Sequence, residues 1–445
     1  MSASNGTQQP SNGSEQKANG TPQPSSVTQH QSGLTQQPSG GSQHHEVLIV
    51  GGGSAGIAVA ARLLQAENPP QVAILDPAEK HYYQPLWTLV GGGVVDKHET
   101  ERDEASVIPD GATWIQDAAT GFDPEHNAVT TGASGTLTYD YLVVCPGIQI
   151  NWNAIPGLAE NLGKNGVCSN YSWEHCDYTW ETVQRIASQP GPVRALFTQP
   201  TGAIKCGGAP QKIMYLTADH LRRTGRLQPG DVQFFSPGQV IFGVTKFAKT
   251  LKQVVARYGI GTNYGHELVE IRGETREAVF KVTGADGSVT ERVEPFDMIH
   301  VAPPQSAPDF LAKSPLASEA GWTDVDKHTL QHVRYPNVFG LGDAGSTPNA
   351  KTGAAIRMQA PTVVHNLLKV RAGESLEQGA EHYDGYASCP LITGYGRLVL
   401  AEFDYNQQPA PSFPFDTSQE RYSMWLLKKD LLPNLYWHGM LQGRA

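Results

Sequence analysis

The stretch HEVLIVGGGSAGIAVAARLLQAENPPQVAILDPAEK, residues 45–80, decides the fold. A strand expected over 47–50 runs into glycines at GxGxxG spacing and then into a helix rich in Ala and Leu. Such glycines permit a tight turn and close approach of the backbone to a pyrophosphate, and the helix N-terminus favours its negative charge. A second strand ends at Asp76, which is placed to accept hydrogen bonds from an adenosine ribose. Together these features predict a dinucleotide-binding unit; a glycine turn without a ligand is the alternative. The turn residues expected at the ligand are Gly51, Gly53, Ser54, Ala55 and Gly56.

Two later segments indicate that the dinucleotide is FAD. TYDYLVVCPG (138–147) reads as a strand that ends in a Pro-Gly turn at Gly147, and YPNVFGLGDAGS (335–346) reads as a strand that ends at Gly342 and Asp343. In flavoproteins with two dinucleotide-binding domains this pair follows the first fingerprint, and the Gly-Asp carboxylate holds the ribityl chain. We therefore predict FAD as the cofactor.

The region between these segments contains a cysteine where a second glycine fingerprint would hold NADH. VRALFTQPTGAIKCGGAPQKIMYL (193–216) opens as a strand followed by a helix, but the glycine triplet is missing and Cys206 lies in the connection. A helix N-terminus favours a thiolate, and Lys212 could add positive charge. The pattern thus favours a redox thiol over a nicotinamide nucleotide; a small buried residue that fills a gap is the alternative.

A redox cysteine usually needs a partner, and Cys389 is the best candidate. It is followed by Pro390, expected at a turn, and heads an apolar strand pair. We expect Cys145 to belong to the core, and Cys168 and Cys176 to be structural. Five unevenly spaced cysteines match neither a disulfide framework nor a zinc pattern, so no metal is expected.

Composition bounds the partners and the compartment. The net charge of −10 argues against nucleic-acid binding, and no stretch approaches the roughly 20 apolar residues of a membrane-spanning helix. Residues 1–44 are mostly Ser, Gln, Gly, Asn, Thr and Pro, and we expect them to be disordered. The C-terminal stretch is rich in aromatic and aliphatic residues with interspersed lysines, which predicts an interfacial helix; a helix packed on the core is the alternative. The residues of that stretch are Tyr422, Trp425, Leu426, Lys428, Lys429, Leu431, Leu432, Leu435, Tyr436 and Trp437.

The expected organisation is α/β. It has two Rossmann-like dinucleotide-binding domains of glutathione-reductase type and a C-terminal region that contacts the membrane. The expected boundaries are 1–44 for the tail, 45–155 and 297–370 for the two parts of the FAD-binding domain, 156–296 for the second domain, and 371–445 for the C-terminal region.

The chain resembles the sulfide:quinone oxidoreductases, in particular the type that includes the mitochondrial enzyme and its bacterial relatives. The resemblance rests on VLIVGGGSAGI, HYYQPLWTLVGGG, KCGGAPQKIMYL, FGVTKFA, YDGYASCPLITGYGRLVLAEFDY and similar segments that cover nearly everything from residue 46 onward. It implies that Cys206 and Cys389 form the redox pair, bridged at rest by a disulfide or by one extra sulfur. Sulfide would attack at Cys389 and leave a persulfide there, which sulfite, glutathione or another sulfide would remove.

The same resemblance implies further site residues. Gln84 and Lys351 would lie near the flavin, where Lys351 could stabilise the anionic reduced flavin. Glu160 matches the position of a carboxylate that mechanisms in this family sometimes use as a base. The resemblance implies that a quinone accepts the electrons and that the C-terminal region, 371–445, contacts this quinone. Where the mitochondrial enzyme has a cysteine after the Gly-Asp motif, this chain has Ala344.

The resemblance also implies a location and leaves rival functions open. We expect peripheral attachment to the cytoplasmic side of the inner membrane in a bacterium, rather than to the mitochondrial inner membrane, and a homo-oligomer is possible. The rival functions are a type II NADH:quinone oxidoreductase and a non-catalytic flavin-binding scaffold.

Overall fold

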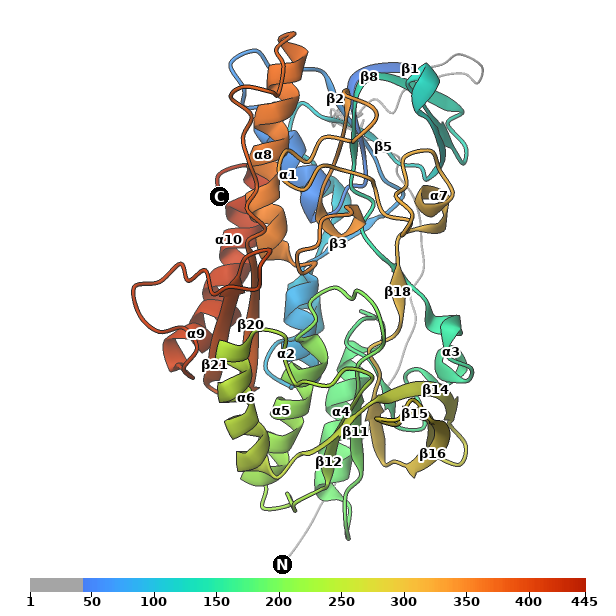
Figure 1. Cartoon of the computed structure of the whole chain (residues 1–445), viewed down its shortest axis with the longest axis vertical. Coiled ribbons are helices and arrows are strands. Elements are labelled where there is room, and N and C mark those ends of the chain that lie inside the picture. Colours follow the sequence, from blue (N-terminus) through green and yellow to red (C-terminus); the bar gives the residue numbers. More distant parts are fainter. Residues whose placement is uncertain (1–42) are drawn as a thin grey trace, which may run out of the picture. The chain divides into compact units, whose positions relative to one another are not determined.

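The computed structural model describes residues 43–445 (Figure 1). Most of the predicted tail therefore lies outside the described residues. Its last two residues, Gln43 and His44, belong instead to the first strand, β1 (Gln43–Val50).

A seven-stranded sheet forms the upper part of Figure 1, with strand order β5-β2-β1-β8-β7-β6 and β19 paired with β8. Strands β1, β2, β5, β8 and β19 are parallel, while β7 pairs antiparallel with β6 and β8. β2 is apolar and fully buried, as expected for a parallel strand covered on both faces. The remaining members are β2 (Val72–Leu75), β5 (Thr113–Ile115), β6 (Ala119–Asp123), β7 (Ala128–Thr131), β8 (Thr136–Val144) and β19 (Val338–Gly340).

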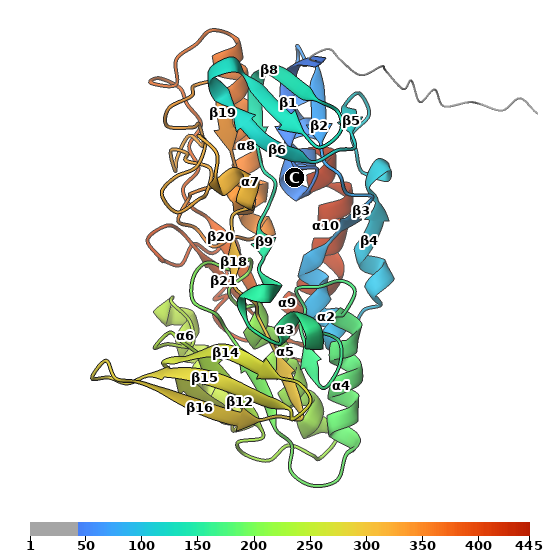
Figure 2. The same ribbon diagram turned by 90° about the vertical axis from the view of Figure 1, so that its right-hand side faces the viewer.

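A second, all-parallel sheet lies lower in Figure 1, with order β10-β17-β11-β12-β13. Because β17 belongs to it, the second domain extends past the predicted limit at residue 296. A three-stranded antiparallel sheet flanks it, and β9 pairs with β18 where the chain passes between the two domains (Figure 2). The strands are β9 (Gln149–Ile150), β10 (Val167–Cys168), β11 (Ala195–Thr198), β12 (Val232–Ser236), β13 (Gly261–Tyr264), β14 (His266–Arg272), β15 (Glu277–Thr283), β16 (Val289–Pro295), β17 (Met298–His300) and β18 (Gln305–Ser306).

Helices cover both sheets, and two further strand pairs complete the fold. The pairs are antiparallel: β3 (Lys80–Tyr82) with β4 (Glu101–Asp103), and β20 (Ala387–Gly394) with β21 (Arg397–Phe403). The α-helices are α1 (Ser54–Leu63), α2 (Trp87–Gly91), α3 (Leu158–Asn161), α4 (Cys176–Ser188), α5 (Ala209–Arg223), α6 (Thr245–Tyr258), α7 (Asp309–Ala312), α8 (Gly353–Arg371), α9 (Tyr422–Leu426) and α10 (Leu432–His438). Short 3-10 turns are η1 (Gln84–Leu86), η2 (Lys97–Thr100), η3 (Glu104–Ser106), η4 (Pro124–His126), η5 (Trp152–Ala154), η6 (Gly342–Ala344) and η8 (Met440–Gln442), and η7 (Leu427–Leu431) is a π-helical turn.

The C-terminal region lies against both domains. In Figure 1 it occupies the left side; α10 and η8 contact α1, and β20 packs on α5. Its last residues pack on α1: Gln65 Nε2 donates to the Gln442 carbonyl over 2.8 Å. The predicted α/β architecture with two Rossmann-like domains is confirmed, and the C-terminal region touches the helix of the first fingerprint.

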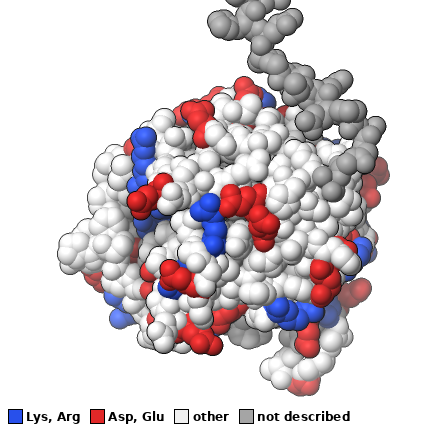
Figure 3. All heavy atoms as spheres, turned by 90° about the horizontal axis from the view of Figure 1, so that it is seen from above, with Lys and Arg blue, Asp and Glu red and all other residues white. Residues whose placement is uncertain are grey.

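The surface seen from above carries no single field of one charge sign. On that face, basic and acidic side chains alternate in small groups among uncharged residues (Figure 3).

Candidate active site

Cys206 lies in the turn that leads into α5. Its φ of 54° is left-handed, which is uncommon for a residue other than glycine. In this conformation its N–H donates to the Lys351 carbonyl over 2.8 Å, and its carbonyl accepts from Ala209 N–H at the first turn of α5 over 2.7 Å. Cys206 is half-buried, and α5 begins at Ala209, directly after its N-cap residue Gly208. The turn thus places the thiol beside the helix N-terminus, where a thiolate is favoured.

Cys389 approaches Cys206 from the β20–β21 pair. The two Sγ atoms are 4.0 Å apart although 183 residues separate them, and Cys389 is 1% exposed. Cys389 is not at a turn, as the sequence suggested: it and Pro390 lie within β20, whose only strand partner among the described residues is β21. Proline is tolerated there because β20 is an edge strand. A Cβ on Gly208 would collide with Leu391, so this glycine permits α5 and β20 to come close.

The two thiols differ in acidity. Lys212 is buried, 3% exposed, and its Nζ lies 3.0 Å from Cys206 Sγ. A hydrogen bond from Cys389 and the Lys212 ammonium hold the pKa of Cys206 well below its usual range, against the effect of burial. The same hydrogen bond, together with burial, raises the pKa of Cys389 well above it. Cys206 is therefore the thiolate of the pair, and Cys389 is the protonated partner.

Lys428 is a second buried cation at this site, and the sequence did not reveal it. The sequence predicts it, with Lys429, as a cation that flanks an interfacial helix, but Lys428 is only 1% exposed. Its Nζ donates to the Pro85 carbonyl over 2.8 Å and lies 5.8 Å from the centroid of the Tyr83 ring. Burial and the neighbouring Lys212 lower the pKa of Lys428 to about 7, although the cysteines oppose this. Lys428 lies in the π-helical turn η7, which shifts the helical register. A regular helical period read from sequence could not place it.

A second group of charges surrounds Asp343. Lys351 Nζ donates to the Asp343 and Gly345 carbonyls over 2.7 and 3.0 Å and lies 3.9 Å from the Trp322 ring. Burial lowers the pKa of Lys351 to about 8, with Asp343 opposing, while burial raises the pKa of Asp343. Lys205, which the sequence reasoning missed, bonds to Gln84 through its ammonium and is drawn electrostatically to Asp343. Its position directly before Cys206 was the available signal.

The predicted dinucleotide fingerprint has the geometry of a phosphate cradle. Gly51 has φ of 110°, and a Cβ on Gly56 would collide with the Gly51 carbonyl, so these two glycines are required by the turn itself. A Cβ on Gly53 would meet nothing within 4 Å, which leaves the mouth of α1 open to a ligand. Asp76 accepts from Gly52 N–H over 2.5 Å and stands beside this mouth.

The Gly-Asp turn contacts the fingerprint helix although the two are far apart in the chain. A Cβ on Gly342 would lie 3.3 Å from the Ala55 side chain, so the Gly-Asp turn borders the fingerprint helix. A Cβ on Gly147, which follows β8, would by contrast meet nothing within 4 Å. These residues therefore fit a dinucleotide that runs from α1 toward Asp343.

The remaining candidate residues lie apart from the Cys206–Cys389 pair. Glu160 is exposed on α3, which packs against β14, and no hydrogen bond or ion pair in residues 43–445 joins it to either cysteine; its role as a base stays a prediction. Cys145, Cys168 and Cys176 are buried, and burial raises the pKa of Cys168 and Cys176 to about 12. Such thiols are unreactive, in agreement with a structural role.

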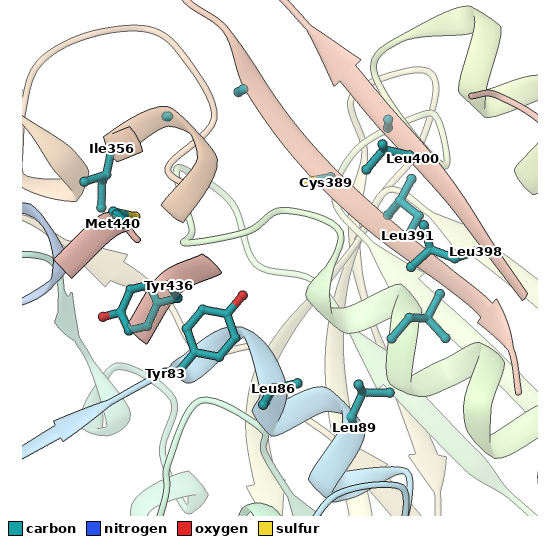
Figure 4. Close-up of a cluster of buried hydrophobic side chains, with 14 of the residues drawn as sticks. Tyr83, Leu86, Leu89, Ile356, Cys389, Leu391, Leu398, Leu400, Tyr436 and Met440 are labelled. Atoms are coloured by element: carbon teal, nitrogen blue, oxygen red, sulfur yellow. The ribbon is translucent and has the colours of Figure 1, made fainter. Parts of the chain in front are cut away.

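The C-terminal aromatic stretch divides into two faces. Trp425, Tyr436 and Trp437 are buried, so for them the alternative of packing on the core is correct. Figure 4 shows Tyr436 beside Tyr83, with ring centroids 4.5 Å apart. The exposed apolar residues of the stretch are Tyr422 at 63%, Leu426 at 40%, Leu431 at 59% and Leu435 at 36%. Within the described part of the chain, no helix has the length and apolar character needed to cross a bilayer.

Known proteins are similar to this chain in sequence and in fold. The family described as pyridine nucleotide-disulphide oxidoreductase matches residues 45–183. A Dictyostelium discoideum protein named sulfide:quinone oxidoreductase, mitochondrial, is 46% identical over 401 residues, which cover 90% of this chain and 86% of that protein. A chain of the Tetrahymena thermophila mitochondrial ATP synthase structure has a TM-score of 0.77 at 20% identity and covers 92% of this chain and 98% of its own. The sulfide:quinone oxidoreductase of Aquifex aeolicus has a TM-score of 0.72 at 19% identity and covers 91% and 92%. At these identities the two structures show likeness of fold.

Proposed function

The chain belongs to the sulfide:quinone oxidoreductase family, and from this premise we propose that it is an FAD-dependent enzyme that oxidises sulfide and passes the electrons to a quinone. The observation that carries the proposal is the pair Cys206 and Cys389, 4.0 Å apart, with Lys212 3.0 Å from Cys206. This pair lies at the helix opening where a second dinucleotide domain would bind NADH.

The difference in acidity sets the direction of the thiol chemistry. In the oxidised form, with Cys206 and Cys389 joined by a disulfide, HS⁻ attacks Cys389 Sγ and forms a new S–S bond as the Cys206–Cys389 bond breaks. The bond's electron pair leaves on Cys206, which becomes a thiolate, and Cys389 carries a persulfide. The thiol with the lower pKa is the better leaving group, and Lys212 stabilises the charge that develops on it. With one extra bridging sulfur, the same attack leaves that sulfur on Cys206.

After the outer sulfur has left Cys389, the disulfide forms again from the two thiolates and releases an electron pair; FAD, when bound, would supply the two-electron acceptor through which this pair reaches the quinone. The chain would hold its phosphates at Gly53 and Ser54, its ribose at Asp76, and its ribityl chain at Asp343. Lys351, which is buried beside Asp343, supplies positive charge on the flavin side of the site. Lys428 and Lys212 supply positive charge on the sulfur side.

The persulfide sulfur on Cys389 must pass to a nucleophile. Because Cys389 is 1% exposed, the acceptor must be small or must reach the sulfur through a narrow group. Sulfite, sulfide and the thiol of glutathione all satisfy this requirement, and sulfite consumption, polysulfide formation and glutathione persulfide formation distinguish them.

Membrane contact is proposed for the exposed apolar face of the C-terminal segment. Tyr422, Leu426, Leu431 and Leu435 project from α9, η7 and α10, with Lys429 beside them. An apolar face with an adjacent cation suits the headgroup region of a bilayer. We place the protein peripherally, on the cytoplasmic side of a bacterial inner membrane or on the mitochondrial inner membrane named for the Dictyostelium relative; fractionation of its own cells separates these, and light scattering measures whether it is a homo-oligomer.

An anaerobic titration tests the proposed function. Sulfide should bleach the flavin absorbance of the purified holoenzyme, and a short-chain quinone should restore it, while NADH should leave it unchanged. Bleaching by NADH alone would indicate a type II NADH:quinone oxidoreductase. A flavin that neither donor reduces would indicate a non-catalytic scaffold.

A further inference from the structure

Four side chains form a continuous hydrogen-bonded chain between the C-terminal helix and the fingerprint helix. Ser54 Oγ lies 2.7 Å from Tyr436 Oη, which lies 2.5 Å from His81 Nε2. His81 Nδ1 is 3.1 Å from a carboxylate oxygen of Glu104. Glu104, His81 and Tyr436 are 1%, 4% and 5% exposed, and the sulfur chemistry described above uses none of them.

When the His81 imidazole is neutral, the hydrogens of this chain can point in two concerted ways. If Glu104 is ionised, it accepts from His81 Nδ1–H, His81 Nε2 accepts from the Tyr436 hydroxyl, and Tyr436 accepts from Ser54. If Glu104 is protonated, it donates to His81, His81 Nε2–H donates to Tyr436, and Tyr436 donates to Ser54. Only the second direction leaves the Ser54 hydrogen free to bond to an anion at the mouth of α1.

The surroundings of Glu104 favour the second direction. Its Oε1 is buried and has no hydrogen-bond partner among the described residues, a costly state for an ionised oxygen and a cheaper one for a neutral carbonyl. The Asp76 carboxylate faces the same glycine: a Cβ on Gly52 would lie 2.9 Å from Asp76 Cβ and 3.0 Å from Glu104 Oε1.

The other charged groups nearby do not offset the cost of an ionised Glu104. From β3, only the His81 imidazole faces Glu104; Lys80 pairs with Asp103 at the surface over 2.7 Å. Arg102, on β4, lies over the Trp437 ring at 4.8 Å, and the side chain that α10 brings to the chain is Tyr436, whose pKa burial raises. Burial and Asp76 raise the pKa of Glu104, and the hydrogen bond and charge of His81 only partly offset this.

We propose that Glu104 is a neutral carboxylic acid in the FAD-bound protein, and that its proton directs the chain through His81 and Tyr436 so that Ser54 donates to the pyrophosphate of FAD. Glu104 and Tyr436 are thus positioning residues for the cofactor. Where Glu104 is ionised in the FAD-free protein, binding of FAD takes up one proton. The inference rests on FAD at the fingerprint and not on the sulfide reaction.

Infrared spectroscopy of the holoenzyme tests the protonation directly. At pH 7 the wild-type protein should show the carbonyl band of a protonated carboxylic acid that is missing from Glu104→Gln and retained in Asp103→Asn, a surface neighbour. Absence of a band specific to Glu104 would overturn the proposal. Reduction of the wild-type flavin by sulfide is measured in a separate experiment. If that reduction fails, the infrared result can still be interpreted.

The dissociation constant of FAD, measured from the free flavin fraction between pH 6 and pH 10, tests the direction of the chain. Glu104→Gln donates an amide N–H to His81 at every pH, so its FAD affinity should stay constant where the wild-type affinity falls as the acid ionises. Tyr436→Phe leaves the Ser54 hydrogen free to bond to FAD at every pH, so its FAD affinity should also lose the pH dependence. A Glu104→Gln protein that weakens with rising pH as the wild type does would refute the role of Glu104.

Discussion

Replacing Lys212 by methionine should remove most of the thiolate character of Cys206. Lys212 Nζ lies 3.0 Å from Cys206 Sγ in a buried position, and methionine keeps a similar length and volume. Opposite charges at this distance attract by about 5.5 kcal/mol at an effective dielectric constant of about 20. Cys389 and Lys428 still favour the thiolate after the substitution, so we take about half of this as lost. A loss of about 2.7 kcal/mol corresponds to about a hundredfold smaller thiolate population when the thiol becomes the dominant form.

The alkylation rate of Cys206 with iodoacetamide measures this population. The parent protein is Cys389→Ser, in which the serine hydroxyl can still donate to Cys206 and the other three thiols are buried with raised pKa values. We expect Lys212→Met in this background to react about a hundredfold more slowly at pH 7, and its rate to increase with pH where the parent rate is already constant. Lys429→Met, whose ammonium pairs with Asp430 at the surface, is the matched control and should react like the parent.

A Lys212→Met protein that is alkylated at the parental rate at pH 7 would refute the reasoning. In that case the helix N-terminus and Cys389 alone would hold the thiolate, and Lys212 would be a packing residue. Equal slowing by Lys429→Met would instead show that the net charge of the protein, and not the 3.0 Å contact, governs the reaction.

Three further outcomes are expected. Cys206→Ser should keep FAD but lose flavin reduction by sulfide, and Cys389→Ser should lose turnover, whereas Cys176→Ser should retain flavin reduction and turnover. Anaerobic flavin spectra and the rate of quinone reduction measure these outcomes. Sulfide oxidation by Cys206→Ser at a normal rate would disprove the thiol pair. The double substitution Leu431→Glu and Leu435→Glu should reduce sedimentation of the protein with phospholipid vesicles, while Val293→Glu, at a position that is 45% exposed on β16, should not. Unchanged sedimentation of the double variant would place the membrane contact elsewhere. Point substitutions are needed because deleting the segment would also remove Lys428 and Tyr436. Burial lowers the pKa of Lys428 to about 7, so between about pH 7 and the ordinary value near 10.5 the unfolded chain binds more protons than the folded one. The melting temperature of the wild type, relative to that of Lys428→Met, should therefore rise with pH across this window. A difference that stays constant with pH would contradict the burial of the Lys428 ammonium.

The local elements could be predicted because their causes are local. Four apolar residues, a glycine turn and an alanine-rich helix within residues 47–63 define the first fingerprint, and the structure has β1 and α1 there. The missing glycine triplet before α5, and the cysteine in its place, could also be read directly from the chain, because a turn into a helix N-terminus involves only neighbouring residues.

The sequence by itself determined the α/β class, the dinucleotide turn and the position of Cys206 at a helix opening. The sequence named Cys389 as the best partner for Cys206, but only the tertiary structure brings the two thiols together across 183 residues, because α5 packs on β20. It also decided the environment of Lys428, since a π-helical turn changes which side of the helix faces the interior. The chain from Glu104 to Ser54 has the same origin: its members come from four separate segments, and no local pattern reports contacts that form only when the whole core closes.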